Sequence, residues 1–226
     1  MLDFDYTFQW RQAFANWPVL LDGAWVTVQV AALSMLLGVV IALFLVAFRQ
    51  SNAWALAPLR WLSHAWISIA RNTPSLFQVY ILYFGLGALG VFVSSWAALL
   101  AGITFNNAGY LAENFRGGLK AIADTQMRAA RSLGMSAFQA WRLVIVPQLL
   151  RVVFPQITNQ MVWAILMTSL GVTVGLNSDL TGVTQELNVR TYRTFELFAI
   201  AAVGYYVLTK LVVLASRLMA WRLFRY

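Results

Sequence analysis

Residues 110–148 read YLAENFRGGLKAIADTQMRAARSLGMSAFQAWRLVIVPQ and hold most of the charge found between two strongly apolar regions of the chain. Two short segments within this stretch, one beginning near Thr125 and one near Ser136, repeat small and apolar residues at spacings of three to four. That spacing indicates helices. The stretch therefore predicts two short helices in a polar loop between apolar segments.

The junction between these two helices carries its own signals. Gly134 can adopt the left-handed backbone conformation that commonly ends a helix. Ser136, with Gln139 three residues later, matches a capping box at a helix start. Pro147 is expected to bend the chain as it enters the next apolar segment. Such a loop suits a groove on a soluble partner, and an interfacial helix pair on anionic lipid is the alternative.

The composition is that of a membrane protein. Of the 226 residues, 61% are apolar and 11% are charged, and the formal net charge is +8. The basic residues stand at the ends of apolar runs, as membrane flanks do, so the charge points to a lipid bilayer and no nucleic acid is expected as a partner. The chain has no cysteine, which excludes disulfides and thiolate metal sites.

Five apolar runs predict an all-α membrane protein, because each is long enough to cross a bilayer as a helix. The expected spans are about 23–48, 61–86, 91–110, 152–173 and 196–216, with a loop at about 111–150, all within a single domain over 1–226. Gly23, Ser34 and Gly38 offer small surfaces for close helix contact. Proline at position 74 disfavours helix at Thr73, so the second run is expected to break there.

The basic residues also predict the orientation in the membrane. Eleven Lys and Arg lie in the 49–60 connection, the 111–151 loop and the C-terminal tail, against three in the N-terminal segment and the 174–195 loop. Short basic loops stay in the cytoplasm. We therefore expect a cytoplasmic loop and C-terminus and an external N-terminus, with Asp3, Asp5 and Asp179 on the outer side. The N-terminal residues lack a signal-peptide pattern, so no cleavage is expected.

Catalysis is not expected in this chain. The sequence has no P-loop, GxSxG or HExxH motif, and no paired carboxylates within one segment. His64 is the single histidine and is expected at an interface or against a helix. No metal site and no catalytic residue are predicted.

A set of matching residues links the loop to a known family. In the loop they are Glu113-x-x-Arg116-Gly117-Gly118, Gln126, Ala129-Ala130-x-Ser132-Leu133-Gly134-Met135-Ser136-x-x-Gln139-Ala140 and Val144-Ile145-x-Pro147-Gln148. In the spans they are Leu21-x-Gly23, Thr27, Arg71-Asn72-Thr73-Pro74-x-Leu76-x-Gln78, Tyr83-Phe84 and Thr168-Ser169-Leu170. The chain thereby resembles the permease subunits of bacterial ABC importers, whose cytoplasmic EAA loop couples to an ATPase. It is most similar to the polar amino acid branch, which includes histidine, arginine, glutamine and glutamate permeases.

The resemblance implies a type I ABC importer fold in the bacterial inner membrane, with a periplasmic N-terminus and a cytoplasmic C-terminus. It implies as partners a second permease, a cytoplasmic ATPase dimer that carries ATP and Mg, and a periplasmic substrate-binding protein. No cofactor is expected in this chain. By carry-over, the residues that couple to the ATPase are Ala129, Ala130, Ser132, Leu133, Gly134, Met135, Ser136, Ile145 and Pro147.

A substrate path is expected where polar or broken helices lie near the midplane of the membrane. The candidates are Asn72, Thr73, Pro74 and Gln78 in the second span, and Asn159, Gln160, Met167, Thr168 and Ser169 in the fourth. Hydrogen bonding between helices is the alternative role for each. Because none of these residues is acidic, an acidic or neutral polar amino acid is the favoured cargo. Arg71 could assist an anionic ligand or extend toward the membrane surface.

The chain departs from the family pattern at three places. Arg128 stands where the loop motif usually begins with Glu, Thr125 replaces a usual Gly, and Leu166-Met167 replaces a common Lys-Asp or Lys-Asn. Arg128 motivates the hypothesis that this chain is one half of an unequal permease pair. Two further alternatives remain: a permease for another cargo such as an opine or a sulfur compound, and a channel or regulatory subunit without ATP-driven transport.

Overall fold

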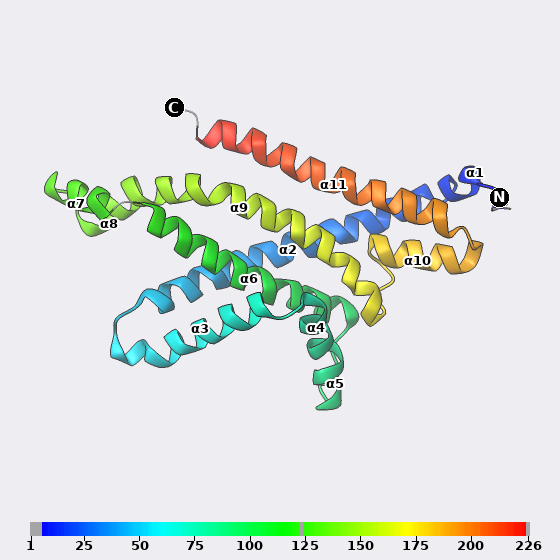
Figure 1. The fold of residues 1–226 in the computed structure, drawn as a ribbon, viewed down its shortest axis with the longest axis horizontal. Helices are drawn as coiled ribbons and strands as arrows, with labels where there is room; N and C mark the ends of the chain where they lie inside the picture. Colours follow the sequence, from blue (N-terminus) through cyan, green and yellow to red (C-terminus); the bar gives the residue numbers. More distant parts are fainter. Residues whose placement is uncertain (1–5, 123, 225–226) are drawn as a thin grey trace, which may run out of the picture.

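The computed structural model describes residues 6–122 and 124–224, so Asp3 and Asp5 lie outside the described residues. The described chain is an elongated bundle of helices (Figure 1). The helices are α1 (Trp10–Phe14), α2 (Trp17–Gln50), α3 (Ala57–Asn72), α4 (Ser75–Tyr80), α5 (Leu86–Ala88), α6 (Ser95–Ala121), α7 (Asp124–Ser132), α8 (Ala137–Ala140), α9 (Val146–Met167), α10 (Leu180–Thr191) and α11 (Thr194–Leu223).

Three helical stretches of the described chain are long and apolar enough to cross a membrane. They are Trp17–Gln50, the continuous run Ala137–Val174 that contains α8 and α9, and Thr194–Leu223. The other two predicted spans are also largely helical, but they are not among these three long, apolar stretches. Residues 61–86 fall largely on α3 and α4 with the π-helical turn Ile81–Gly85. Of residues 91–110, those from Ser95 onward form the first part of α6. For the remaining two of the five predicted spans, membrane crossing stays a prediction from the sequence.

Several helices run further than the predicted spans. Helix α6 continues without a break from the predicted third span to Ala121, so Glu113, Arg116 and Gly118 lie on a helix rather than in a loop. Helix α9 begins at Val146 rather than near 152. Hydropathy marks where side chains stop being apolar, whereas a helix ends only where its backbone loses hydrogen bonds. The polar segment outside these helices is therefore shorter than predicted.

The chain breaks in the second span at the predicted position. Helix α3 ends at Asn72, Thr73 is extended with φ −121° and ψ 144°, and α4 begins after Pro74. The bundle is packed around α2 and α6, whose buried residues include Val30, Leu99 and Ile103.

Small residues allow the helices to approach closely, as the sequence suggested for Gly23, Ser34 and Gly38, all of which are buried. A Cβ at Gly38 would lie 2.9 Å from the Cβ of Asn107 on α6. A Cβ at Gly109 would lie 2.4 Å from the Cβ of Ala70 on α3. Neither neighbouring atom belongs to a flexible side chain that could move away. Helix contacts in this bundle therefore depend on glycine at these positions.

Two glycines of α6 make a matched test of this packing. We expect Gly109→Ala to lower the thermal stability of the purified protein, because overpacking a tight contact costs about 1–3 kcal/mol. Gly117→Ala should raise it slightly, because a Cβ there meets nothing within 4 Å and alanine favours helix by about 1 kcal/mol. Unfolding midpoints in detergent compare the two variants, and equal midpoints would contradict the close α3–α6 contact.

The 174–195 segment contains a short helix, α10, over Leu180–Thr191. Asp179 is buried and caps this helix by accepting hydrogen bonds from the backbone N–H groups of Thr181 (3.1 Å) and Gly182 (3.2 Å). Burial raises the pKa of the Asp179 carboxyl, and these two hydrogen bonds act in the opposite direction. The backbone N–H of Leu180 donates to Thr27 Oγ1 at 3.2 Å, which ties α10 to α2.

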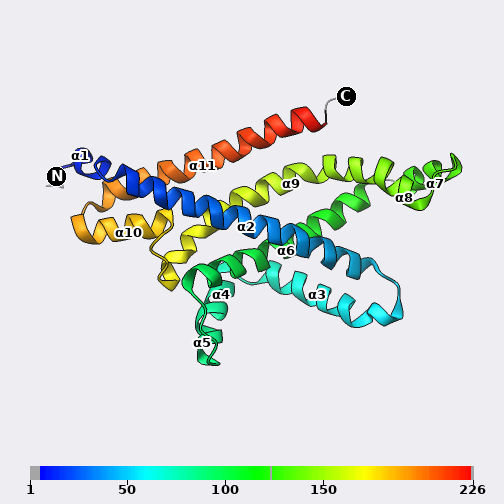
Figure 2. The same ribbon diagram turned by 180° about the vertical axis from the view of Figure 1, so that it is seen from behind.

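The two ends of the bundle differ in what they carry. Figure 1 places α7, α8, the α2–α3 connection and the end of α11 toward one end, and α1 and α10 toward the other. Figure 2 shows the same separation from behind. The segments richest in Lys and Arg therefore share one end of the molecule.

Candidate functional site: the coupling hairpin and the polar cavity

The segment Asp124–Ile145 is here called the coupling hairpin, after the role that the family resemblance implies for it. It is built around the predicted glycine turn. Gly134 has φ +83°, and its N–H donates to the carbonyl of Arg131 at 3.1 Å. The N–H of Met135 donates to the carbonyl of Ala130 at 3.3 Å. This pair of bonds is a Schellman motif, which satisfies carbonyls that the end of α7 would leave unpaired. Gly134 therefore ends α7 in the way the sequence predicted.

The second arm of the coupling hairpin begins with the predicted capping box. Gln139 N–H donates to Ser136 Oγ at 3.2 Å, and Ser136 N–H donates to Gln139 Oε1 at 2.8 Å. Helix α8 then continues through the π-helical turn Trp141–Ile145 into α9. Pro147 stands in the first turn of α9, where a missing N–H costs little. The chain therefore enters α9 as a continuous helix, with a local π-helical turn just before Pro147.

The nine predicted coupling residues divide into exposed and buried ones. Ala130 and Ile145 are buried, one in each arm of the hairpin. The remaining ones lie at the surface or partly so: Ala129, Ser132, Leu133, Gly134, Met135, Ser136 and Pro147. Leu133 is 81% exposed, and Phe138, which the sequence did not single out, is 71% exposed. An apolar face at the tip of a polar segment has the character of a contact surface.

The basic residues of the coupling hairpin are not all available to a partner. Arg131 Nη1 donates to the carbonyl of Met135 at 2.9 Å and so braces the glycine turn. Arg128 is exposed on α7, and its carbonyl accepts a hydrogen bond from Ser132 Oγ at 3.0 Å. The unusual arginine therefore faces outward from the coupling hairpin.

One carboxylate outside the coupling hairpin forms ion pairs with three arginines from three helices. Glu113 on α6 pairs with Arg49 of α2 at 2.7 Å, with Arg71 of α3 at 3.6 Å, and with Arg116 of its own helix. Arg71 also lies over the ring of Tyr110, with its guanidinium carbon 5.8 Å from the ring centroid. The structure thus gives Arg71 an internal partner, a role that was not among the two expected for it.

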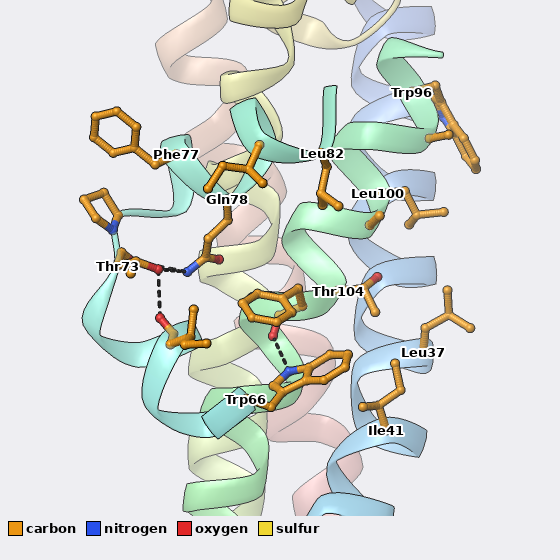
Figure 3. Close-up of a pocket in the computed structure, with 16 residues that line it drawn as sticks. Leu37, Ile41, Trp66, Thr73, Phe77, Gln78, Leu82, Trp96, Leu100 and Thr104 are labelled. Atoms are coloured by element: carbon orange, nitrogen blue, oxygen red, sulfur yellow. Dashed lines mark hydrogen bonds between the residues drawn. The ribbon is translucent and has the colours of Figure 1, made fainter. Parts of the chain in front are cut away.

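The break at Thr73 is held by one buried glutamine. Pro74 has no N–H, so the carbonyl of Ala70 loses its helical partner. Gln78 Nε2 takes that place, donating to Ala70 O at 3.0 Å, to Thr73 O at 3.1 Å and to Thr73 Oγ1 at 2.9 Å. Figure 3 shows the side chains of Gln78 and Thr73 turned toward each other across the break. Asn106 Nδ2 donates to Gln78 Oε1 at 3.1 Å from α6.

A polar cavity of about 620 Å³ lies beside this break. Its lining comes from α4, α6, α9 and the break itself: Thr73, Pro74, Ser75, Asn106, Tyr110, Asn114, Pro155, Gln156, Asn159, Gln160, Trp163 and Met167. Five of the residues predicted for a substrate path are among them: Thr73, Pro74, Asn159, Gln160 and Met167. The structure therefore brings the second and fourth predicted spans together at one cavity.

The other four predicted path residues have different places. Gln78 makes the bonds across the break given above and lines a different cavity, and Asn72 Nδ2 donates to Ser68 O at 2.8 Å. Thr168 and Ser169 donate to carbonyls of their own helix, Ile165 O at 2.8 Å and Leu166 O at 2.7 Å. The bonds of Asn72, Thr168 and Ser169 lie within single helices rather than between helices. A path role for these residues therefore stays a prediction.

Sequence reasoning missed the contribution of α6 to the polar cavity. Asn106, Tyr110 and Asn114 line it from that helix. Their spacing of four residues places them on one helical face. That spacing within an otherwise apolar run was the signal that could have found them.

A second cavity, of about 720 Å³, also borders the break at Thr73 and Pro74 (Figure 3). It is lined mainly by apolar side chains such as Leu37, Phe77 and Leu100. Trp66 Nε1 at its edge donates to the carbonyl of Phe105 at 3.2 Å. The two cavities thus differ in character, and only the first offers several polar groups to a ligand.

Comparison with known proteins agrees with this architecture. Residues 34–225 match the family of binding-protein-dependent transport system inner membrane components. The chain is 33% identical over 233 residues to the octopine transport system permease protein OccM of Rhizobium radiobacter, covering 98% of this chain and 91% of that protein. It is 30% identical over 202 residues to the histidine/lysine/arginine/ornithine transport system permease protein HisM of Escherichia coli K12, covering 84% and 83%.

A solved structure extends the likeness to the fold. The crystal structure of an amino acid ABC transporter with histidines contains a chain that matches with a TM-score of 0.87 and 28% identity. The match covers 96% of this chain and 100% of that one. The all-helical fold with its coupling hairpin is therefore that of an amino acid ABC transporter permease.

The chain belongs to the family of binding-protein-dependent transport system inner membrane components. It is a multi-pass inner-membrane permease subunit of an ABC importer, within the polar amino acid branch of these permeases. Its partners as a member of this class are an ATPase and a substrate-binding protein, and ATP hydrolysis belongs to the separate ATPase subunit.

Proposed function

We propose that this chain and a second, homologous permease form the path by which a polar amino acid or an opine enters the cell. A cytoplasmic ATPase dimer, which carries ATP and Mg, drives the import, and a periplasmic protein delivers the cargo. The observation that carries this proposal is that one chain combines two features. The coupling hairpin exposes apolar side chains at its tip, and a polar cavity lies between α4, α6 and α9.

The proposed orientation places the coupling hairpin and the C-terminus in the cytoplasm and the N-terminus in the periplasm. The segments richest in Lys and Arg gather at the end that holds the coupling hairpin, and basic flanks favour the cytoplasmic side. The exposed tip of the hairpin, with Leu133 and Phe138, then meets the ATPase. Helix-in-groove contacts transmit rigid-body motion, so closure of the ATPase dimer moves α9.

The second permease is proposed to be a different chain. Arg128 supports this, because it is exposed on α7 at the position where the family motif usually carries Glu. A reversed charge at this contact suits a partner surface unlike the usual one. The pair is therefore expected to present two unequal hairpins to the ATPase dimer.

The cargo is proposed from the cavity and from the relatives. No charged side chain lines the polar cavity within the described chain. The named relatives transport octopine in one case and histidine, lysine, arginine and ornithine in the other. An amino acid or opine with several polar groups fits both observations. A channel or regulatory role is disfavoured, because neither needs a coupling hairpin.

The test uses the whole transporter. The chain is co-expressed with the ATPase, the sister permease and the binding protein encoded beside it, and the complex is placed in liposomes. We expect ATP-dependent accumulation of at least one of L-glutamine, L-glutamate, L-histidine, L-arginine and octopine. Equilibration of a compound without ATP would indicate a channel instead. A complex with two copies of this chain and no sister permease would contradict the unequal pair.

A further inference from the structure

The polar cavity presents mainly carboxamides among its polar side chains, and its lining offers no charge within the described chain. Five carboxamide side chains line it: Asn106, Asn114, Gln156, Asn159 and Gln160. A carboxamide can present either a carbonyl acceptor or an NH₂ donor. What the cavity binds therefore depends on which way these amides are turned.

The orientation of Asn106 is fixed by the helix break. Gln78 spends its NH₂ group on Ala70 O, Thr73 O and Thr73 Oγ1, so its Oε1 must accept. Asn106 Nδ2 donates to that Oε1 at 3.1 Å and to Ala70 O at 3.2 Å. Both partners of Asn106 are acceptors without a hydrogen to give. Asn106 cannot turn over without losing both bonds, so Oδ1 is its remaining polar atom.

The orientation of Gln160 is fixed by a buried relay of side chains. Ser34 Oγ donates its single hydrogen to Ala31 O at 2.8 Å, so toward Asn107 it can only accept. Asn107 Nδ2 donates to Ser34 Oγ at 3.2 Å, which leaves Asn107 Oδ1 to accept from Gln160 Nε2 at 2.9 Å. The relay thus turns the NH₂ group of Gln160 toward Asn107, where one of its two hydrogens is donated, and Oε1 remains on the other side of the amide.

The orientation of the Gln156 amide is set by backbone carbonyls of its own helix. Its amide nitrogen satisfies Val152 O at 2.6 Å and Val153 O at 3.0 Å in the orientation that agrees with its surroundings. Its Oε1 then faces away from those carbonyls. Gln156 therefore becomes a third residue of the lining with its NH₂ group spent on the protein.

The oxygens of Asn106 and Gln160 are open to the cavity. Both residues are only 6% exposed, and neither oxygen accepts a hydrogen bond within the described chain. The fully buried unpaired polar side-chain atoms of that part of the chain are Thr104 Oγ1 and Arg193 Nε, so these two amide oxygens are not sealed off. Tyr110 and Trp163 add aromatic rings to the same lining.

From this we infer that the polar cavity holds a protonated nitrogen of the cargo, an ammonium or guanidinium group, through the oxygens of Asn106, Gln156 and Gln160. Amide oxygens carry partial negative charge and accept from N–H donors. Aromatic faces attract cations as well. Three oriented acceptors therefore favour the cationic end of a cargo over a carboxylate, without an acidic side chain. This inference rests on the proposed import function and names the part of the cargo that this site takes.

The test reverses the charge beside these oxygens. Asn159 lines the same cavity, is exposed, and makes no hydrogen bond within the described chain. Equilibrium dialysis measures binding of the radiolabelled panel compounds to the purified permease–ATPase complex without nucleotide. We expect Asn159→Lys to weaken binding at least tenfold and Asn159→Asp to leave it equal or tighter. Asn159→Met matches lysine in length without its charge and should weaken binding less than Asn159→Lys does. Asn52→Lys controls for total charge and should change binding less than threefold.

Tighter binding by Asn159→Lys and weaker binding by Asn159→Asp would overturn the inference, because a site for the carboxylate end of the cargo would respond in that way. Unchanged binding in both variants, in a complex that still imports cargo, would overturn it while leaving the proposed function intact. A wild-type complex that imports none of the panel would instead contradict the proposed function. If Asn159→Lys fails to assemble, Gln156→Lys and Gln156→Glu make the same comparison.

Competition experiments distinguish the two groups of the cargo that the cavity could hold, the ammonium and the guanidinium. L-citrulline keeps the ammonium group but lacks the charged guanidinium group, and Nα-acetyl-L-arginine keeps the guanidinium group but lacks the ammonium. The compound that displaces the labelled cargo identifies the bound group. Displacement by neither, together with displacement by a carboxylate such as glutarate, would overturn the inference.

Discussion

Replacing Gly134 with valine is expected to abolish ATP-driven uptake while the chain remains in the membrane. Gly134 has φ +83°, a conformation that costs an L-residue about 1–2 kcal/mol and a β-branched residue more. The strain disrupts the Schellman bonds and changes the angle between α7 and α8. Uptake into proteoliposomes and the rate of ATP hydrolysis are the two measurements. Hydrolysis is expected to continue without transport.

Gly134→Asn is the matched control for this substitution. Asparagine tolerates the left-handed conformation, and a Cβ at Gly134 meets nothing within 4 Å of this chain. Most of the uptake should therefore remain in Gly134→Asn. If valine and asparagine were equally harmful, the backbone conformation would not be the reason, and contact with the ATPase surface would have to be. Wild-type uptake by Gly134→Val would remove Gly134 from the coupling role.

Replacing Glu113 with glutamine is expected to destabilise the end of the bundle that holds the coupling hairpin. Glu113 is the shared partner of Arg49, Arg71 and Arg116, and its side chain is only 19% exposed. Without it, three guanidinium groups from three helices face one another with no counter-charge. Hydrogen bonds to charged groups contribute about 1.5–3 kcal/mol, so a clear fall in the unfolding midpoint of the purified complex is expected.

Arg71→Gln is the comparison for Glu113→Gln. Arg71 is 41% exposed and its removal leaves Glu113 with two arginines. Exposed ion pairs contribute about 0–1 kcal/mol, so this variant should be close to wild type. Equal losses in the two variants would show that Glu113 is not a shared partner.

Local features of this chain followed from its sequence because they depend on a few neighbouring residues. The turn at Gly134, the capping box of Ser136 and Gln139, and the break before Pro74 each rest on backbone conformation or hydrogen bonds within a few positions. The expected close contacts at Gly23, Ser34 and Gly38 also agree with the structure. The type of every long element was therefore predictable.

Features that depend on distant residues were not predictable in the same way. Helix α6 runs past the predicted loop boundary because Glu113 and Arg116 find partners on α2, α3 and α6 itself. Asn106 and Gln78 stand out in the sequence as polar residues in apolar runs, but nothing there tells a residue that lines a cavity from one that bonds across the helix break. Their roles depend on the carbonyl of Ala70, which becomes unpaired only when Pro74 stands four residues later. Such pairings need the three-dimensional arrangement of α3, α4 and α6.

The continuous course of α6 has a mechanical consequence. At a rise of about 1.5 Å per residue, its 27 residues form a rod of roughly 40 Å. Asn106, Tyr110 and Glu113 follow one another at intervals of four and three, so the cavity amide and the arginine partner lie on one stripe of that rod. The neighbouring α3–α4 segment has a joint at Thr73. A rotation of α6 about its axis therefore displaces the cavity wall and the ion pairs of Glu113 together. The α3–α4 segment can follow this movement by bending at Thr73.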